Sequence, residues 1–246
     1  MIDTFGRVHR DLRISVTDRC NFRCTYCMPA DGLEWLPREG LLTFEEIERV
    51  ARLMVERHGV ESIRLTGGEP TVRANLPTLV AMLADLPVDL SLTTNGMTLR
   101  LVAGKLAAAG LKRINVSLDS LRADRFEEIT LRNELPRVLD GIDAAIEAGL
   151  YPVKVNVVVM RGVNDDELVD LARFGRERGV EVRFIEFMPL DADRSWSEGA
   201  VVGQDEILAR IGEVFPLEPV DRTSAPATRY RYVDGAGGIG VVASVT

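Results

Sequence analysis

The sequence predicts an α/β fold in which parallel strands form a barrel or partial barrel with a polar interior. Two observations lead to this prediction. First, strand-like apolar runs alternate with amphipathic helical patterns about six times along the 246 residues, which favours parallel strands joined by right-handed crossovers. Second, the predicted strands have one apolar and one polar face, so helices are expected to cover only one side of the sheet.

The elements follow one another in a regular order. The predicted strands lie at residues 12–17, 60–66, 88–93, 111–118, 153–159 and 180–187, and the helical patterns at residues 43–58, 75–86, 100–109, 135–148 and 165–178. The first helix opens with Thr43 and Glu46, which are spaced as a capping box. Four helices are followed by a glycine that suits a left-handed helix end, namely Gly59, Gly110, Gly149 and Gly179. After Pro189 the pattern weakens to one helix at 204–214 and short strands at 228–233 and 239–245.

The polar faces of the strands distinguish this fold from a common barrel. A (β/α)₈ barrel fills its interior with branched apolar side chains, whereas a polar interior indicates a wet cavity that holds a charged ligand. A half-open sheet with one solvated face is the alternative. The polar faces carry Arg13, Ser15, Thr17, Ser62, Arg64, Thr66, Asp89, Ser91, Thr93, Asn95, Arg113, Asn115, Ser117, Asp119, Lys154 and Asn156.

Composition restricts the class of protein. Lys and Arg number 30 against 38 Asp and Glu, and hydrophobic residues make up 46%, which is typical of a soluble globular chain. The net charge of −8 argues against a general nucleic-acid-binding role. No apolar run reaches 18 residues, and the polar N-terminal segment does not resemble a secretory signal, so we expect no membrane span and a cytoplasmic location.

The three cysteines lie together directly after the first predicted strand. Cys20, Cys24 and Cys27 form a C-x3-C-x2-C pattern, and an odd, clustered set indicates metal or redox chemistry rather than a disulfide framework. Three thiolates are one ligand short of a structural zinc site or an electron-transfer [4Fe–4S] cluster. A metal centre held by them would keep an open coordination position. Simple buried thiols and a non-enzymatic zinc-binding protein remain alternatives.

The cysteine pattern with Tyr26 before its last member resembles the radical S-adenosylmethionine (radical SAM) superfamily. The Gly67-Gly68-Glu69 sequence after the second predicted strand resembles that superfamily's second motif. The resemblance implies a partial (β/α)₆ barrel of the TIM-like radical SAM type and one [4Fe–4S] cluster on Cys20, Cys24 and Cys27. It also implies S-adenosyl-L-methionine on the open iron, and radical chemistry carried by the cofactor rather than by a catalytic side chain.

Longer stretches are similar to one family within that superfamily, the GTP 3′,8-cyclases of molybdenum cofactor biosynthesis. They lie at residues 12–24, 26–29, 63–70, 92–96, 113–119, 153–156 and 183–188. The resemblance implies a lyase that abstracts the C3′ hydrogen of GTP and forms 3′,8-cyclo-7,8-dihydro-GTP. It assigns S-adenosylmethionine contacts to Tyr26 (through its backbone), Gly68, Ser117 and Met188. It assigns GTP contacts to Arg13, Arg64, Thr93 and Lys154.

The match has one departure. The family holds a second [4Fe–4S] cluster on three C-terminal cysteines, and no cysteine follows Cys27 here. We therefore expect a radical SAM core at residues 5–215, the start of a truncated C-terminal region at 216–246, and no second cluster. A radical SAM enzyme for another substrate, and an inactive iron–sulfur-binding relative, are the alternatives. The implied partners are GTP, a flavodoxin- or ferredoxin-like electron donor and, optionally, a second copy of the chain.

Overall fold

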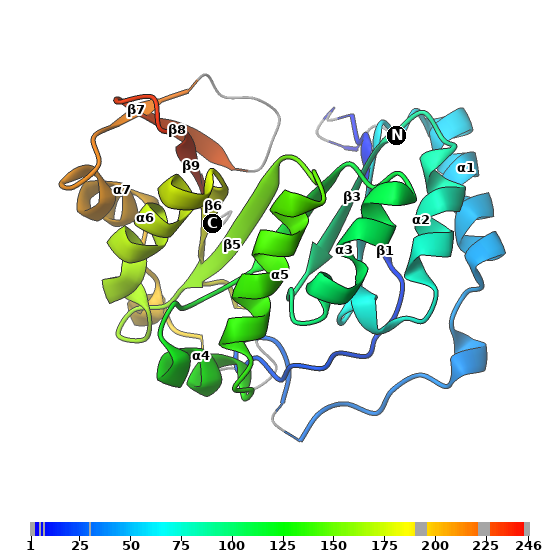
Figure 1. The fold of residues 1–246 in the computed structure, drawn as a ribbon, viewed down its shortest axis with the longest axis horizontal. Helices are drawn as coiled ribbons and strands as arrows, with labels where there is room; N and C mark the ends of the chain where they lie inside the picture. Colours follow the sequence, from blue (N-terminus) through cyan, green and yellow to red (C-terminus); the bar gives the residue numbers. More distant parts are fainter. Residues whose placement is uncertain are drawn as a thin grey trace. The chain divides into compact units, whose positions relative to one another are not determined.

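The computed structural model describes residues 3–4, 6, 8–29, 31–189, 196–220 and 227–243, and the chain forms two compact units. Unit 1 consists of Met1–Asn21, Glu34–Asn115 and Pro136–Val153. Unit 2 consists of Phe22–Leu33, Val116–Leu135 and Lys154–Thr246. Two of the five points at which the chain passes between the units lie within strand β4 (Arg113–Ser117) and within the cysteine loop. Figure 1 shows the order of the elements by colour along the chain.

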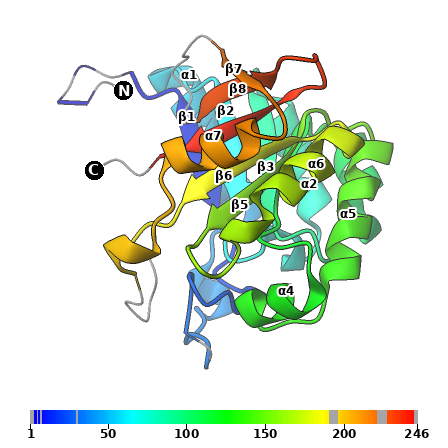
Figure 2. The ribbon, with the colours of Figure 1, turned by 90° about the vertical axis from the view of Figure 1, so that its left-hand side faces the viewer.

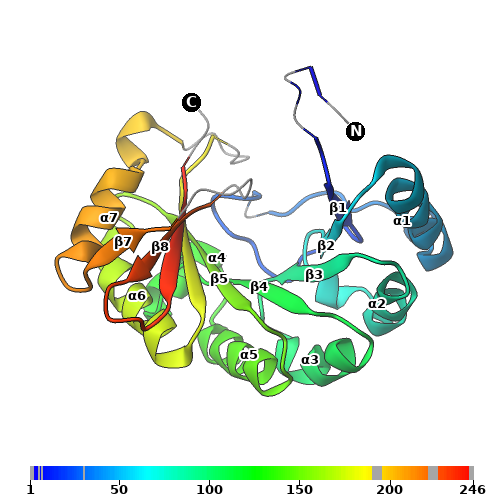
Figure 3. The same cartoon turned by 90° about the horizontal axis from the view of Figure 1, so that it is seen from above.

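Unit 1 is built from parallel strands with helices on one side. Its strands are β1 (Asp11–Ser15), β2 (Ser62–Thr66) and β3 (Asp89–Thr94), paired in that order. Its helices are α1 (Phe44–His58), α2 (Leu76–Ala84), α3 (Leu99–Ala108) and all but the first residue of α5 (Leu135–Glu147). Short 3₁₀ turns lie at η1 (Arg38–Gly40) and η2 (Pro70–Val72). Figure 3 shows α1, α2 and α3 on one side of these strands.

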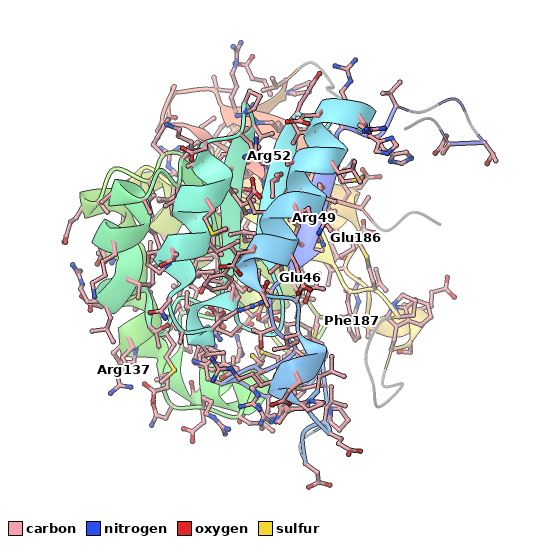
Figure 4. All side chains as sticks on the ribbon, turned by 90° about the vertical axis from the view of Figure 1, so that its right-hand side faces the viewer. Glu46, Arg49, Arg52, Arg137, Glu186 and Phe187 are labelled. Atoms are coloured by element: carbon pink, nitrogen blue, oxygen red, sulfur yellow. The ribbon has the colours of Figure 1, made fainter. Side chains whose placement is uncertain are left out.

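Helix α1 shows how local sequence sets the boundaries. The Thr43 hydroxyl accepts from the Glu46 amide at 3.2 Å, and the Glu46 carboxylate accepts from the Thr43 amide at 2.8 Å, so the predicted capping box is present. The helix ends at Gly59, which has the left-handed φ of +68°. The exposed residues Glu46, Arg49 and Arg52 project from α1 (Figure 4).

Unit 2 combines parallel and antiparallel strands. Strand β5 (Val153–Val159) pairs in parallel with β6 (Glu181–Glu186), and β6 with β9 (Gly238–Val242). Strands β8 (Thr228–Tyr232) and β7 (Leu217–Pro219) continue antiparallel from β9. The helices are α4 (Ala123–Thr130), α6 (Leu168–Arg178) and α7 (Gln204–Gly212), with 3₁₀ turns at η3 (Asp165–Glu167) and η4 (Glu198–Ala200). Helix α7 lies next to α6 and β7 (Figure 2).

The predicted α/β pattern of parallel strands is confirmed, with two elements added. Each predicted strand and helix is present with ends shifted by a few residues, and the 165–178 helix starts as the η3 turn. The strand predicted at 239–245 ends at Val242, and residues 244–246 lie outside the described residues. Helix α4 and the three-residue strand β7 were not predicted.

The alternation of strand faces is confirmed on β2 and β5. On β2, Ile63 and Leu65 are fully buried whereas Arg64 is partly exposed, and β5 alternates without a break. The polar faces of β3 and β4 are less open, because Ser91 and Asn115 are buried. Ser91 donates to the Ile63 carbonyl and the Asn115 amide to the Thr93 hydroxyl, both at 3.3 Å, so burial leaves these polar groups satisfied.

Candidate cofactor and substrate site

The cysteine loop follows β1 and contains all three thiols. Cys20 and Cys24 are half-buried, Cys27 is the most exposed, and none is in a disulfide. The Cys24 carbonyl accepts the amides of Cys27 at 2.9 Å and Met28 at 3.1 Å, which makes a tight turn between the last two cysteines. Partial enclosure of its sulfur raises the pKa of the Cys27 thiol, so a metal bound there would displace a proton.

The first part of the loop, residues 17–21, is held in unit 1 by the backbone of the loop after β2. The Gly68 amide donates to the Thr17 carbonyl and the Glu69 amide to the Arg19 carbonyl, both at 2.7 Å. A Cβ on Gly68 would lie 2.4 Å from the Asp18 and Arg19 carbonyl oxygens. The glycine therefore lets two backbone segments approach each other directly beside Cys20.

Glu69 links this glycine loop to the end of β3. Its buried carboxylate accepts from the Thr71 amide at 3.0 Å, the Thr71 hydroxyl at 2.5 Å, the Thr94 hydroxyl at 2.6 Å and the Asn95 amide at 2.6 Å. Burial raises the pKa of Glu69, and the four hydrogen bonds oppose that rise. Glu69 thus joins the loop after β2 to the end of β3, a role that the sequence motif alone did not predict.

Asn95 extends this network to the cysteine loop. The Asn95 side-chain amide donates to Asn21 Oδ1 at 2.7 Å, and Asn21 Nδ2 lies 2.8 Å from the Met97 sulfur. Asn21 is adjacent to Cys20 in sequence. The loop after β3 therefore fixes the residue that follows the first cysteine.

The second part of the loop, residues 22–28, is held in unit 2 by helix α4. The helix-end carbonyls of Ile129 and Thr130 accept the amides of Thr25 at 2.9 Å and Arg23 at 3.0 Å. The Phe22 ring meets the Phe126 ring edge to face, with centroids 5.9 Å apart. Groups that a helix end leaves without intrahelical partners are thus satisfied by the cysteine loop.

Tyr26 has a separate anchor in unit 2. Its hydroxyl donates to Asp119 Oδ2 at 2.7 Å, and Asp119 Oδ1 accepts the Val158 amide at 2.8 Å. Burial raises the pKa of Asp119 to about 6, against the lowering effect of these hydrogen bonds, and raises that of Tyr26 well above its ordinary value. The sequence placed Asp119 on a polar strand face but gave it no partner.

A cavity of about 230 Å³ lies beside this tyrosine within unit 2. Mostly apolar side chains surround it, and two of them belong to residues predicted to contact a cofactor. The lining consists of Tyr26, Cys27, Val158, Ile185, Glu186, Phe187 and Met188. Figure 4 labels Glu186 and Phe187, which lie at the end of β6. The Glu186 carboxylate is fixed by the Gln204 amide at the start of α7, at 2.8 Å.

The predicted GTP contacts lie on polar strand faces in both units. In unit 1, Arg13 and Arg64 are register partners on neighbouring strands β1 and β2, and Thr93 lies on β3. In unit 2, Lys154 is the register partner of Glu181, with 3.7 Å between Nζ and Oε1. Ser117 is the last residue of β4. Arg113, which shares the polar face but has no predicted role, pairs with Asp89.

The described residues contain neither a preformed metal site nor a helix that could cross a membrane. No group of three His, Cys, Asp or Glu side chains among them is arranged as a metal site, so the cysteines are candidates through their spacing and thiol chemistry. None of the helices formed by the described residues has the length and apolar character needed to cross a membrane.

Comparisons with known proteins identify similar sequences over the whole chain. Residues 14–175 match the Radical SAM superfamily and residues 180–246 match Molybdenum Cofactor Synthesis C. The GTP 3′,8-cyclases of Rhodopirellula baltica, Corynebacterium glutamicum and Streptomyces coelicolor are 53%, 48% and 50% identical over all of this chain. The chain covers 70%, 69% and 74% of their respective lengths.

Solved structures show the same fold at low identity. Methylornithine synthase superposes with a TM-score of 0.64 at 17% identity, covering 86% of this chain and 64% of that one. Streptococcus suis SuiB bound to S-adenosylmethionine superposes with a TM-score of 0.62 at 18% identity, covering 76% and 41%. The radical SAM fold class predicted from the sequence is thereby confirmed.

Proposed function

The chain belongs to the radical SAM superfamily and, within it, to the GTP 3′,8-cyclase family, and from this premise we propose that it converts GTP to 3′,8-cyclo-7,8-dihydro-GTP in molybdenum cofactor biosynthesis. The observation that carries the proposal is identity of about half over the full chain to curated enzymes of that activity. Low-identity structural neighbours support only the fold.

The residues of the cysteine loop fit an iron–sulfur cluster. Cys20, Cys24 and Cys27 supply three thiolates, the donor type that such clusters take, and leave one iron for another ligand. The close backbone approach at Gly68 fixes the residues before Cys20. The end of α4 fixes the residues before and after Cys24. When bound, the cluster supplies the electron that cleaves S-adenosylmethionine reductively.

The proposed S-adenosylmethionine contacts follow from the hydrogen-bonding groups and the cavity surface that each residue offers. The Gly68 amide already donates to Thr17, so its carbonyl is the group that would accept from the ammonium of the methionine moiety. Tyr26 and Met188 line one apolar cavity in unit 2, next to Cys27, and would contact the cofactor there. Ser117, at the end of β4, would contribute a hydroxyl.

The proposed GTP contacts are a set of cations and one hydroxyl on polar strand faces. Arg13 and Arg64 lie side by side in register, as two guanidinium groups that bind the oxygens of one triphosphate would. Thr93 adds a hydroxyl in the same unit, and Lys154 in unit 2 is proposed as a separate GTP contact. These side chains would bind and orient the nucleotide, so that the C3′ hydrogen is presented to the radical derived from the cofactor.

The reaction also needs a source of electrons. We propose a flavodoxin- or ferredoxin-like donor, in line with the family's chemistry. We also propose a cytoplasmic location and the option of a homodimer.

Isotope transfer tests the proposed function. Reconstituted protein is incubated under anaerobic conditions with S-adenosylmethionine, dithionite and GTP deuterated at C3′. We expect deuterium in the 5′-deoxyadenosine that forms, little cyclised nucleotide because no cysteine follows Cys27, and no 5′-deoxyadenosine with Cys24→Ala. Unlabelled 5′-deoxyadenosine alone would contradict GTP as the substrate and favour another radical SAM reaction.

A further inference from the structure

Asp119 connects the cysteine loop to a strand of unit 2 through both of its carboxylate oxygens. Oδ1 accepts the Val158 amide on β5 at 2.8 Å, and Oδ2 accepts the Tyr26 hydroxyl at 2.7 Å. Asp119 is only 3% exposed. One carboxylate oxygen accepts from a backbone amide and the other from a phenol. Because each oxygen has its own donor, the orientation of the carboxylate is defined.

The segment that carries Asp119 is itself fixed. The buried Asn164 side chain donates to the Asp119 carbonyl at 2.8 Å and to the Val158 carbonyl at 2.8 Å. Buried Glu167 accepts from the Ser120 hydroxyl at 2.7 Å and the Leu121 amide at 2.8 Å. Asp119 therefore extends from a hydrogen-bonded segment, and the Tyr26 hydroxyl is held by a group outside the cysteine loop.

The Tyr26 ring is a boundary between packed side chains and the cavity. It packs against a buried cluster of Ile129, Met160 and Phe187, and it also lines the cavity that Cys27 and Met188 share. Since the side chain stays partly exposed, packing does not enclose the whole ring. The hydrogen bond at the ring's tip adds a directional constraint that packing does not provide.

We propose that Asp119 is a positioning residue. By accepting a hydrogen bond from the Tyr26 hydroxyl, it holds the Tyr26 ring in place as one wall of the cavity beside Cys27 and Met188. The position of this ring then sets the affinity for S-adenosylmethionine. The inference rests on the proposed function, because it takes this cavity as part of the S-adenosylmethionine site. Asp119 acts on the cofactor only through Tyr26.

Substitutions separate this role from a general structural one. Asp119→Asn keeps one oxygen for the Val158 amide, and its new amide can donate to the Tyr26 oxygen, so the connection survives with its polarity reversed. Tyr26→Phe keeps the ring and removes only the hydroxyl. Asp119→Ala removes the anchor altogether. Tyr232→Phe is the matched control, since Tyr232 is buried in unit 2 and its hydroxyl donates to the Ala172 carbonyl at 3.4 Å.

The test measures cofactor binding to the reconstituted full chain. Iron per chain is determined first, and the dissociation constant for S-adenosylmethionine is then measured by anaerobic equilibrium dialysis. The change in the electron paramagnetic resonance (EPR) signal of the reduced cluster is followed over the same titration. We expect about tenfold weaker binding for Tyr26→Phe and Asp119→Ala, as for loss of a charge-assisted hydrogen bond, and a change within about twofold for Asp119→Asn and Tyr232→Phe. Iron content should equal that of the wild type in all four variants.

Three outcomes would overturn the inference. Wild-type affinity in Tyr26→Phe would show that the hydroxyl does not position the ring for the cofactor. Equal losses in Asp119→Asn and Asp119→Ala would show that the charge, not the connection, matters. If only Tyr26→Phe lost iron, the Tyr26 hydroxyl would serve cluster assembly rather than cofactor binding. If the wild-type cluster itself fails to respond to S-adenosylmethionine, the proposed function fails too, so the two failures are distinguishable.

Discussion

The two parts of the cysteine loop are held by different kinds of contact. Residues 17–21, in unit 1, are fixed by backbone hydrogen bonds from Gly68 and Glu69 and by the Asn95–Asn21 pair. Residues 22–28, in unit 2, are fixed by the end of α4, by the Phe22–Phe126 ring contact and by the Tyr26–Asp119 hydrogen bond. The first part depends on close backbone approach and the second on a helix and side-chain packing.

The two kinds of contact tolerate different substitutions. A close backbone approach admits no added atom, because the clash would be with carbonyl groups that cannot rotate away. Ring packing admits smaller side chains at a cost that grows with the cavity left behind. The two parts of the cysteine loop should therefore respond differently to substitution.

The largest loss of stability is expected when Phe126, which packs against the second part of the cysteine loop, is truncated. Phe126 is 1% exposed and carries the ring contact to Phe22. We expect Phe126→Ala to lower the free energy of unfolding of the cluster-free chain by about 3–5 kcal/mol, and Phe126→Leu by clearly less, since leucine refills part of the cavity. Urea denaturation measures both. A loss below about 1 kcal/mol for the alanine variant would mean that α4 does not hold this part by packing.

A single methyl group added at Gly68, beside the first part of the cysteine loop, should also destabilise the chain. We expect Gly68→Ala to lower the free energy of unfolding of the cluster-free chain by about 3 kcal/mol, because its Cβ meets two carbonyl oxygens at 2.4 Å. Gly104→Ala, inside α3 with nothing within 4 Å of the new Cβ, is the control and should be neutral or stabilising by up to about 1 kcal/mol. Similar values for the two variants would remove the argument for a close approach.

The Asp119 anchor should make stability depend on pH. Its pKa is about 6 in the folded chain against an ordinary 3.8, so the folded state binds the proton more tightly than the unfolded state does. The free energy of unfolding should therefore fall by about 3 kcal/mol in all as pH rises from well below 3.8 to well above 6, and by about 2 kcal/mol of this between pH 4.5 and 7.5. In Asp119→Asn this component disappears. Urea denaturation of both cluster-free chains at pH 4.5 and 7.5 gives the difference, and parallel pH profiles would contradict the assignment.

The smallest expected effect concerns Glu69. In Glu69→Gln one carboxylate oxygen becomes an amide that faces the Asn95 N–H, so an acceptor is replaced by a donor. We expect a loss of about 2 kcal/mol in the free energy of unfolding. Glu56→Gln, an exposed change on α1, should stay within about 0.5 kcal/mol. A Glu69→Gln variant as stable as this control would show that the glycine loop does not depend on the carboxylate.

The same comparison explains what the sequence could predict. The boundaries of α1 were predictable because Thr43, Glu46 and Gly59 act locally, and the glycine pair marked the close approach in unit 1. Helix α4 gave no such signal. It is eight residues long and ends at Leu131, which takes a left-handed φ of +53° in place of the usual glycine. The predicted cluster, S-adenosylmethionine and GTP residues were assigned by resemblance, and their roles stay predictions.

The contact between Tyr26 and Asp119 could not be predicted from the sequence because the residues are 93 positions apart. Strand alternation placed Asp119 on the same face as Ser117, but β4 ends at Ser117, two residues before Asp119. Side chains beyond a strand end do not follow its period of two. The orientation of Asp119 comes instead from Asn164 and Val158, which reach it only in the folded unit.

The central claim is that three cysteines leave one iron of the cluster open to S-adenosylmethionine. The most direct measurement is the EPR spectrum of the reduced, reconstituted chain before and after S-adenosylmethionine is added. We expect about four irons per chain and a shift of the g-values when the cofactor binds. A spectrum that stays unchanged at saturating S-adenosylmethionine would contradict it.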